Sequence, residues 1–132
     1  MTRRIDAHHH VWDLAVRDQP WIVGEAMERV RRSFDIDEFA VRTQESGVTA
    51  SVVVQTVADI SETEELLDLA AATPLVAGVV GWADLAAANV GDQLDRLRAI
   101  GPWAVLARAG VGRCGRQRRV GPIETVGIRE RE

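Results

Sequence analysis

The residues best suited to chemistry lie near the amino terminus of this 132-residue chain, in the run Asp6-Ala7-His8-His9-His10, which contains all three histidines. Alternate side chains of a β-strand point to opposite faces. If the run ends a strand, His8 and His10 share one face with Asp6 behind them, and His9 points the other way. Two such imidazoles can bind one divalent metal such as zinc, which activates a bound water and polarises a carbonyl. The alternative is a polar strand end whose histidines make ordinary hydrogen bonds.

Strand-like and helix-like segments alternate around and after this run. Continuous β-branched or apolar stretches predict strands, and apolar residues at helical spacing predict helices. The predicted strands span residues 5–12, 49–57 and 75–82, and the predicted helices span residues 35–46, 61–73 and 90–100. The long connection over residues 13–34 predicts a functional loop or an extra short helix.

Capping residues predict where the helices begin and end. Asp35, with Glu38 three residues later, has the spacing of a capping box, and Gly47 is placed to end that helix. Ser61 and Glu64 have the same capping-box spacing at the start of the second helix.

Alternating strands and helices are typical of an α/β fold with a parallel sheet. Two architectures remain open, a doubly wound sheet and a (β/α)8 TIM barrel. A complete barrel needs roughly 250 residues, so the chain would contain only the first three to four units. In a barrel the carboxyl ends of the strands surround one mouth.

Three further residues at strand ends are candidate substrate-binding groups: Gln55 after the second strand, and Trp82 and Asp84 after the third. Each also has an ordinary structural interpretation. Gln55 can begin a loop, Trp82 can fill the core, and Asp84 can cap a turn.

Composition indicates a globular protein, with 46% hydrophobic and 27% charged residues. The longest apolar run, residues 75–83, is too short to span a membrane. One cysteine, Cys114, cannot form an internal disulfide, so a cytoplasmic location is expected. The net charge of −4 is mild and indicates neither nucleic acid nor a membrane as partner.

Charge divides the chain near residue 101. Residues 1–103 contain 9 arginines and 17 acidic residues, a net charge of −8, whereas residues 104–132 contain 7 arginines and 3 acidic residues, a net charge of +4. We therefore expect a folded part over residues 1–101 and a divergent, frameshifted or unstructured Arg-rich tail over residues 102–132. Without a partner strand, the third strand would be an exposed edge that favours self-association.

The tail contains no convincing site. Residues 110–115 match G-x-G-x-x-G, but no amphipathic helix follows, so a dinucleotide site is rejected. Cys114 has no base partner in the sequence. Residues 103–107 and 125–129 could each supply a fourth strand.

Residues 4–101 resemble the amidohydrolase-related family (amidohydrolase family 2), and within it the lactonase branch of fuconolactonases and rhamnonolactonases. The matching motifs are Ile5-Asp6-Ala7-His8-His9-His10-Val11-Trp12-Asp13, Gln19-Pro20-Trp21-Ile22, Val52-Val53-Val54-Gln55-Thr56, Glu62-Thr63 through Leu69-Ala70, and Val79-Val80-Gly81-Trp82-Ala83-Asp84-Leu85. A small-molecule substrate is what this resemblance implies. The resemblance implies a TIM barrel that hydrolyses a sugar-acid lactone or related cyclic ester. His8 and His10 would bind a metal or the substrate carbonyl, and some members of the branch work without a tightly bound metal.

Two functional groups of the family have no counterpart here. The family uses a histidine from a middle strand and an aspartate from the last strand as general base. Its fourth strand ends in a Gly-(Val/Ile)-Arg-His type run, which Val126-Gly127-Ile128-Arg129 resembles with Glu130 in place of histidine. The alternative to an enzyme is therefore a catalytically inactive remnant that binds a partner or oligomerises.

Overall fold

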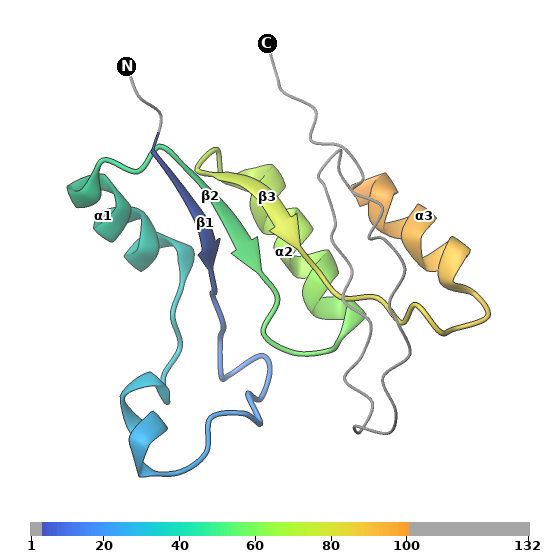
Figure 1. Cartoon of the computed structure of the whole chain (residues 1–132), viewed down its shortest axis with the longest axis horizontal. Helices are drawn as coiled ribbons and strands as arrows, with labels where there is room; N and C mark the ends of the chain where they lie inside the picture. Colours follow the sequence, from blue (N-terminus) through green and yellow to red (C-terminus); the bar gives the residue numbers. More distant parts are fainter. Residues whose placement is uncertain (1–3, 101–132) are drawn as a thin grey trace, which may run out of the picture.

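Three parallel strands in consecutive order form the sheet of the computed structural model, which describes residues 4–100 (Figure 1). The strands are β1 (Ile5–His9), β2 (Ala50–Val54) and β3 (Val76–Val80), and the helices are η1 (Glu25–Val30), α1 (Ile36–Ser46), α2 (Ile60–Ala72) and α3 (Val90–Ile100). The predicted order of strands and helices is confirmed. The expected tail over residues 102–132 and both candidate fourth strands lie outside the described residues.

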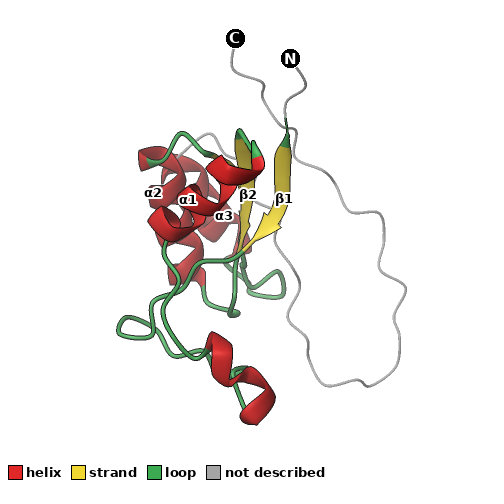
Figure 2. Ribbon diagram, turned by 90° about the vertical axis from the view of Figure 1, so that its left-hand side faces the viewer, coloured by secondary structure: helices red, strands yellow, loops and turns green. Residues whose placement is uncertain are grey.

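The positions of the helices and the order of the strands favour one of the two candidate architectures, the TIM barrel, over the doubly wound sheet. Figure 2 shows α1, α2 and α3 together on one face of the sheet. A doubly wound sheet has helices on both faces and reverses its strand order, whereas a TIM barrel keeps the order consecutive and all helices outside. The order β1-β2-β3, without a reversal among the described strands, matches consecutive units of a TIM barrel.

Apolar side chains from the sheet, α2 and α3 form the core. Val53 and Val79 pack against Leu66, Leu67 and Leu97, and each of these five side chains is at most 4% exposed. Complete burial of a leucine contributes roughly 1.5–3 kcal/mol. The core therefore holds β2 and β3 against the helices that follow them.

The structure confirms both predicted ends of α1, the N-cap residue Asp35 and the terminating residue Gly47. The carboxylate of Asp35 accepts a hydrogen bond from the Glu38 backbone N–H at 2.8 Å. Gly47 ends the helix with φ at 68°, a left-handed conformation that glycine adopts without steric cost.

The predicted start of α2 is wrong. Asp59, not Ser61, is the N-cap residue, and its carboxylate accepts from the Ser61 backbone N–H at 2.9 Å. A carboxylate is favoured at a helix amino terminus because the helix dipole is positive there. The Ser61 hydroxyl instead donates to the same Asp59 oxygen at 2.8 Å.

The long connection between β1 and α1 contains the short helix η1, as expected, and it is closed at its base. Trp12 and Phe34 form an antiparallel bridge, with N–H to O distances of 3.0 and 2.8 Å. Arg17 fastens the connection to α2, because its guanidinium donates to both carboxylate oxygens of Glu65 at 2.8 and 2.9 Å. The connection is thus attached to the fold at both of these points.

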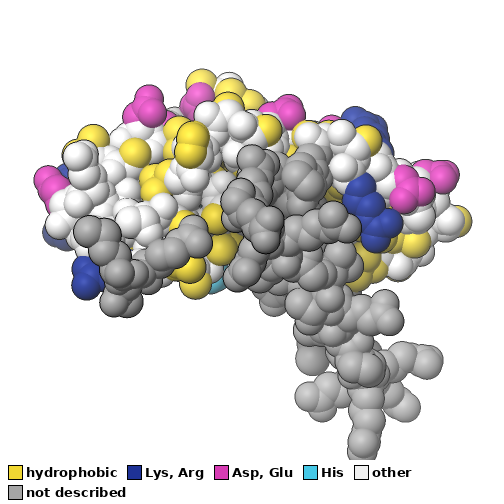
Figure 3. Space-filling model, turned by 90° about the horizontal axis from the view of Figure 1, so that it is seen from above, with side chains coloured by type: hydrophobic (Ala, Val, Ile, Leu, Met, Phe, Trp, Pro, Cys, Tyr) yellow, Lys and Arg dark blue, Asp and Glu magenta, His cyan; other side chains and the backbone are white. Residues whose placement is uncertain are grey.

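The helices within residues 4–100 are too short or too polar to cross a membrane. Figure 3 views the molecule from the end where the strands begin, and acidic and arginine side chains are interspersed on that face.

Candidate active site

His8 and His10 converge at the carboxyl end of β1. Their Nε2 atoms lie 3.2 Å apart, and the two rings meet edge to face with centroids 4.9 Å apart. Both residues are exposed. The Asp6 carboxylate accepts a hydrogen bond from the His8 backbone N–H at 3.0 Å.

The neighbouring strand fixes the orientation of His10. Its Nδ1 lies 2.8 Å from the Val54 carbonyl oxygen at the end of β2. A carbonyl oxygen only accepts, so Nδ1 is the protonated nitrogen and Nε2 presents its lone pair toward His8. A histidine that binds a metal commonly donates its other ring N–H to a backbone carbonyl in this way.

His9 points away from the pair and into the fold. It is 7% exposed, its ring stacks on Phe39 of α1 with centroids 3.7 Å apart, and its Nε2 lies 3.1 Å from the Ser51 hydroxyl. Burial lowers the pKa of His9 to about 4. His9 is therefore a neutral structural residue at neutral pH.

Gln55 and Trp82 follow the adjacent strands β2 and β3. The Gln55 backbone N–H donates to the Val80 carbonyl at 2.8 Å, which extends the ladder beyond the last paired residues. Both residues are partly buried, and neither Gln55 Oε1 nor Trp82 Nε1 has a hydrogen-bond partner within residues 4–100. A buried acceptor and a buried donor thus remain available beside the carboxyl ends of β2 and β3.

Asp84 is exposed and caps a turn. Its carboxylate accepts from the Ala86 backbone N–H at 3.0 Å. This contact matches the structural interpretation of Asp84, and a role in substrate binding remains a prediction.

The His8–His10 geometry fits two positions of a zinc site. Two ligands at about 2.0–2.1 Å from a tetrahedral zinc lie about 3.3–3.4 Å apart, close to the observed 3.2 Å. A catalytic zinc takes three protein ligands. Residues 4–100 contain no cluster of three or more potential ligands, so His8 and His10 alone do not complete such a site.

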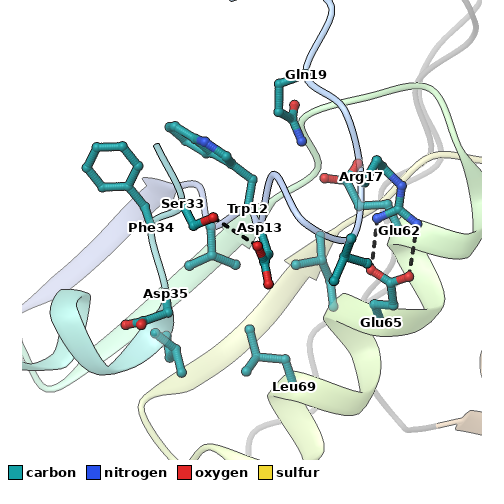
Figure 4. A pocket seen from close by; sticks show the side chains of 14 residues that line it. Trp12, Asp13, Arg17, Gln19, Ser33, Phe34, Asp35, Glu62, Glu65 and Leu69 are labelled. Atoms are coloured by element: carbon teal, nitrogen blue, oxygen red, sulfur yellow. Dashed lines mark hydrogen bonds and ion pairs between the residues drawn. The ribbon is translucent and has the colours of Figure 1, made fainter. Parts of the chain in front are cut away.

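A separate cavity of about 340 Å³ lies between the β1–α1 connection and α2 (Figure 4). Its walls are mostly apolar and include Trp12, Phe34 and Leu69, and the Arg17–Glu65 ion pair crosses one side. Neither His8 nor His10 lines it. The histidine pair therefore belongs to a different surface, at the ends of the strands.

The sequence includes Glu62 and Thr63 in a motif of the resembled family, but it did not show that they support these strand ends. Glu62 and Thr63 of α2 are buried and contact the segments that follow β2 and β3. The sequence showed that Glu62 and Thr63 lie near the start of a helix. It did not show that they form hydrogen bonds with the segments after β2 and β3.

Two known proteins of similar sequence come from Burkholderia species. An L-fucono-1,5-lactonase of Burkholderia ambifaria is 42% identical over 85 residues, covering 64% of this chain and 29% of that protein. An L-fucono-1,5-lactonase of Burkholderia multivorans is 36% identical over 95 residues, covering 72% of this chain and 32% of that protein. The chain thus spans about a third of the length of these relatives. No family model matches the sequence.

Solved structures show the same relationship. An amidohydrolase of Burkholderia multivorans with bound HEPES superposes with a TM-score of 0.68 at 35% identity, covering 74% of this chain and 33% of that one. A second crystal form, with bound zinc, gives a TM-score of 0.64 over 71% of this chain and 33% of that one. Sequence and fold agree in both comparisons: the chain is similar to about a third of the length of these lactonases and amidohydrolases.

Proposed function

We propose that the chain takes part in the hydrolysis of a sugar-acid 1,5-lactone or a related cyclic ester. The observation that supports this most is the convergence of two imidazole nitrogens at a barrel strand end, 3.2 Å apart. The L-fucono-1,5-lactonase relatives support the substrate class.

His8 and His10 are proposed to hold the carbonyl end of the substrate. In lactone hydrolysis water adds to the carbonyl carbon, the ring C–O bond breaks, and the departing oxygen takes a proton to give a hydroxy acid. The two nitrogens would hold a cation that orients the carbonyl and stabilises the negative charge that develops on its oxygen. Gln55 Oε1 and Trp82 Nε1 would accept from and donate to the sugar hydroxyls.

Zinc is the proposed cofactor, with His8 and His10 as two of its ligands. When bound, such an ion polarises a carbonyl or lowers the pKa of a water. A metal-independent reaction would instead need an Nε2–H of the pair to donate to the carbonyl oxygen. The relation to a zinc-bound amidohydrolase favours the metal.

The test is turnover by the purified 132-residue chain of a panel of sugar 1,5-lactones, followed through the acid released, with added zinc and with a chelator. We expect hydrolysis above the spontaneous rate, and its loss in His8→Ala and His10→Ala. His9→Gln is the matched control, since His9 faces away from the pair, and it should retain turnover. Turnover unaffected by both alanine variants would contradict the assignment.

An inactive remnant that binds a partner or oligomerises is the second candidate. It is favoured by the ligand count, because residues 4–100 provide two ligands where a catalytic zinc takes three. Absence of turnover at every zinc concentration would support it.

A further inference from the structure

Two adjacent polar residues in the first turn of α2, Glu62 and Thr63, are buried as deeply as the apolar core. Glu62 is 4% exposed and Thr63 is 0% exposed. Burial of a carboxylate or a hydroxyl is unfavourable unless hydrogen bonds replace its contacts with water. The hydrogen-bond partners of these two side chains therefore indicate which parts of the fold the two residues hold in place.

Glu62 holds the segment that follows β2. Its Oε2 accepts from the Val57 backbone N–H at 2.9 Å, and the carboxylate also accepts from the Thr56 backbone N–H at 2.9 Å and from the Thr56 hydroxyl. Hydrogen bonds to an ionised acceptor are stronger than neutral ones. Glu62 thus fixes the backbone immediately after Gln55.

Thr63 holds the segment that follows β3. Its hydroxyl accepts from the Trp82 backbone N–H at 2.7 Å and donates to the Trp82 carbonyl at 2.8 Å. The contact is close, because a Cβ added at Gly81 would lie 2.2 Å from the Thr63 methyl group. Both backbone polar groups of Trp82 are therefore fixed by one side chain.

We propose that Glu62 and Thr63 are positioning residues that place Gln55 and Trp82 relative to each other. Consecutive residues of one rigid helical turn bind the two strand ends, so the spacing between those ends is set by the helix. Gln55 and Trp82 each carry a buried side-chain atom, an acceptor and a donor respectively, that has no hydrogen-bond partner within residues 4–100. The inference deepens the proposed function and rests on it for the identity of the ligand, but the positioning itself can be measured without substrate.

The experiment uses nuclear magnetic resonance on the full chain, with Thr63→Val, Thr63→Ser and Glu62→Gln. Valine keeps the shape of threonine and removes the hydroxyl, whereas serine keeps the hydroxyl. Glutamine replaces one of the two carboxylate oxygens, which accept hydrogen bonds from Thr56 and Val57, with an NH2 group that cannot accept them. Thr43→Val is the matched control, because Thr43 is also buried, at 5% exposed, and its hydroxyl donates to Ala40 within α1.

In Thr63→Val we expect the Trp82 backbone amide to exchange with solvent at least about tenfold faster, since it loses its acceptor, and the Trp82 indole resonance to move. In Glu62→Gln we expect faster exchange at Val57 and a displaced Gln55 side-chain amide resonance. Thr63→Ser and Thr43→Val should leave the Trp82 resonances at their wild-type positions.

The proposal is overturned if Thr63→Val leaves the Trp82 signals unchanged, or if Thr63→Ser displaces them as far as valine does. If Thr63→Val does not fold, the serine variant decides alone, and displaced signals there overturn the proposal. For a chain that hydrolyses a sugar lactone, Thr63→Val should raise KM more than it lowers kcat, with recovery in Thr63→Ser. Turnover with unmoved Trp82 signals would refute the positioning and leave the proposed function standing.

Discussion

At the residue scale, three consecutive histidines occupy different environments because strand side chains alternate. The Ser51 hydroxyl donates to the Leu75 carbonyl at 3.3 Å, so it accepts from His9 Nε2–H. His9 Nδ1 is buried and has no hydrogen-bond partner within residues 4–100. A proton there would have no acceptor, which agrees with the lowering of the His9 pKa by burial.

This difference predicts a pH dependence of stability. An unfolded histidine binds a proton near pH 6.5, whereas folded His9 binds one only near pH 4. Between these values the unfolded state binds more protons, so stability falls as the pH falls. One pKa unit corresponds to about 1.36 kcal/mol, so the loss between pH 7 and pH 4.5 should be about 2 kcal/mol. Urea unfolding measured at both pH values tests this.

His9→Gln supplies the control for that titration. Glutamine can still donate to Ser51 and does not ionise, so its free energy of unfolding should fall less than that of the wild type over the same interval. An equal fall in the variant would show that other groups cause the pH dependence.

The spacing of the histidines was enough to predict that His8 and His10 share a face. It could not reveal Thr63, whose hydroxyl meets a backbone 19 positions away in the sequence. Contacts of this kind depend on the packing of α2 against the sheet, and no local pattern encodes them.

At the element scale, periodicity and caps predicted the order and type of every strand and α-helix in residues 4–100, with strands three to four residues too long. The strands end where backbone pairing ends, and an apolar pattern does not mark that point. The start of α2 was misplaced because Ser61 and Asp59 are both capping residue types. Only the observed hydrogen bond from the Ser61 N–H distinguishes them.

The two capping residues give a direct comparison. We expect Asp59→Ala to lower the free energy of unfolding by about 1–2 kcal/mol, because an N-cap carboxylate satisfies an otherwise free helix N–H. Ser61→Ala should cost less than half as much. Chemical denaturation of both variants measures the difference, and a larger loss in Ser61→Ala would contradict the assignment of the cap.

At the scale of the whole molecule, consecutive parallel strands with helices on one face place β3 at an edge of the described sheet. Unpaired backbone groups at a sheet edge can pair with another chain. We propose that the 132-residue chain self-associates through β3.

Sedimentation velocity over a range of concentrations measures this association. A lysine at the exposed position Ala77 of β3 should weaken it, because charged side chains on an edge oppose pairing. A wild-type chain that stays monomeric at all concentrations, or an Ala77→Lys variant that associates equally well, would contradict the proposal.

The central claim is that His8 and His10 form one two-nitrogen site, and spectra of the histidine ring nitrogens during titration with zinc test it most directly. We predict that the Nε2 signals of His8 and His10 shift together at the same zinc concentrations, that His9 does not respond, and that His10→Ala abolishes the response of His8. Zinc that shifts His9, or that shifts His8 equally well without His10, would contradict the claim.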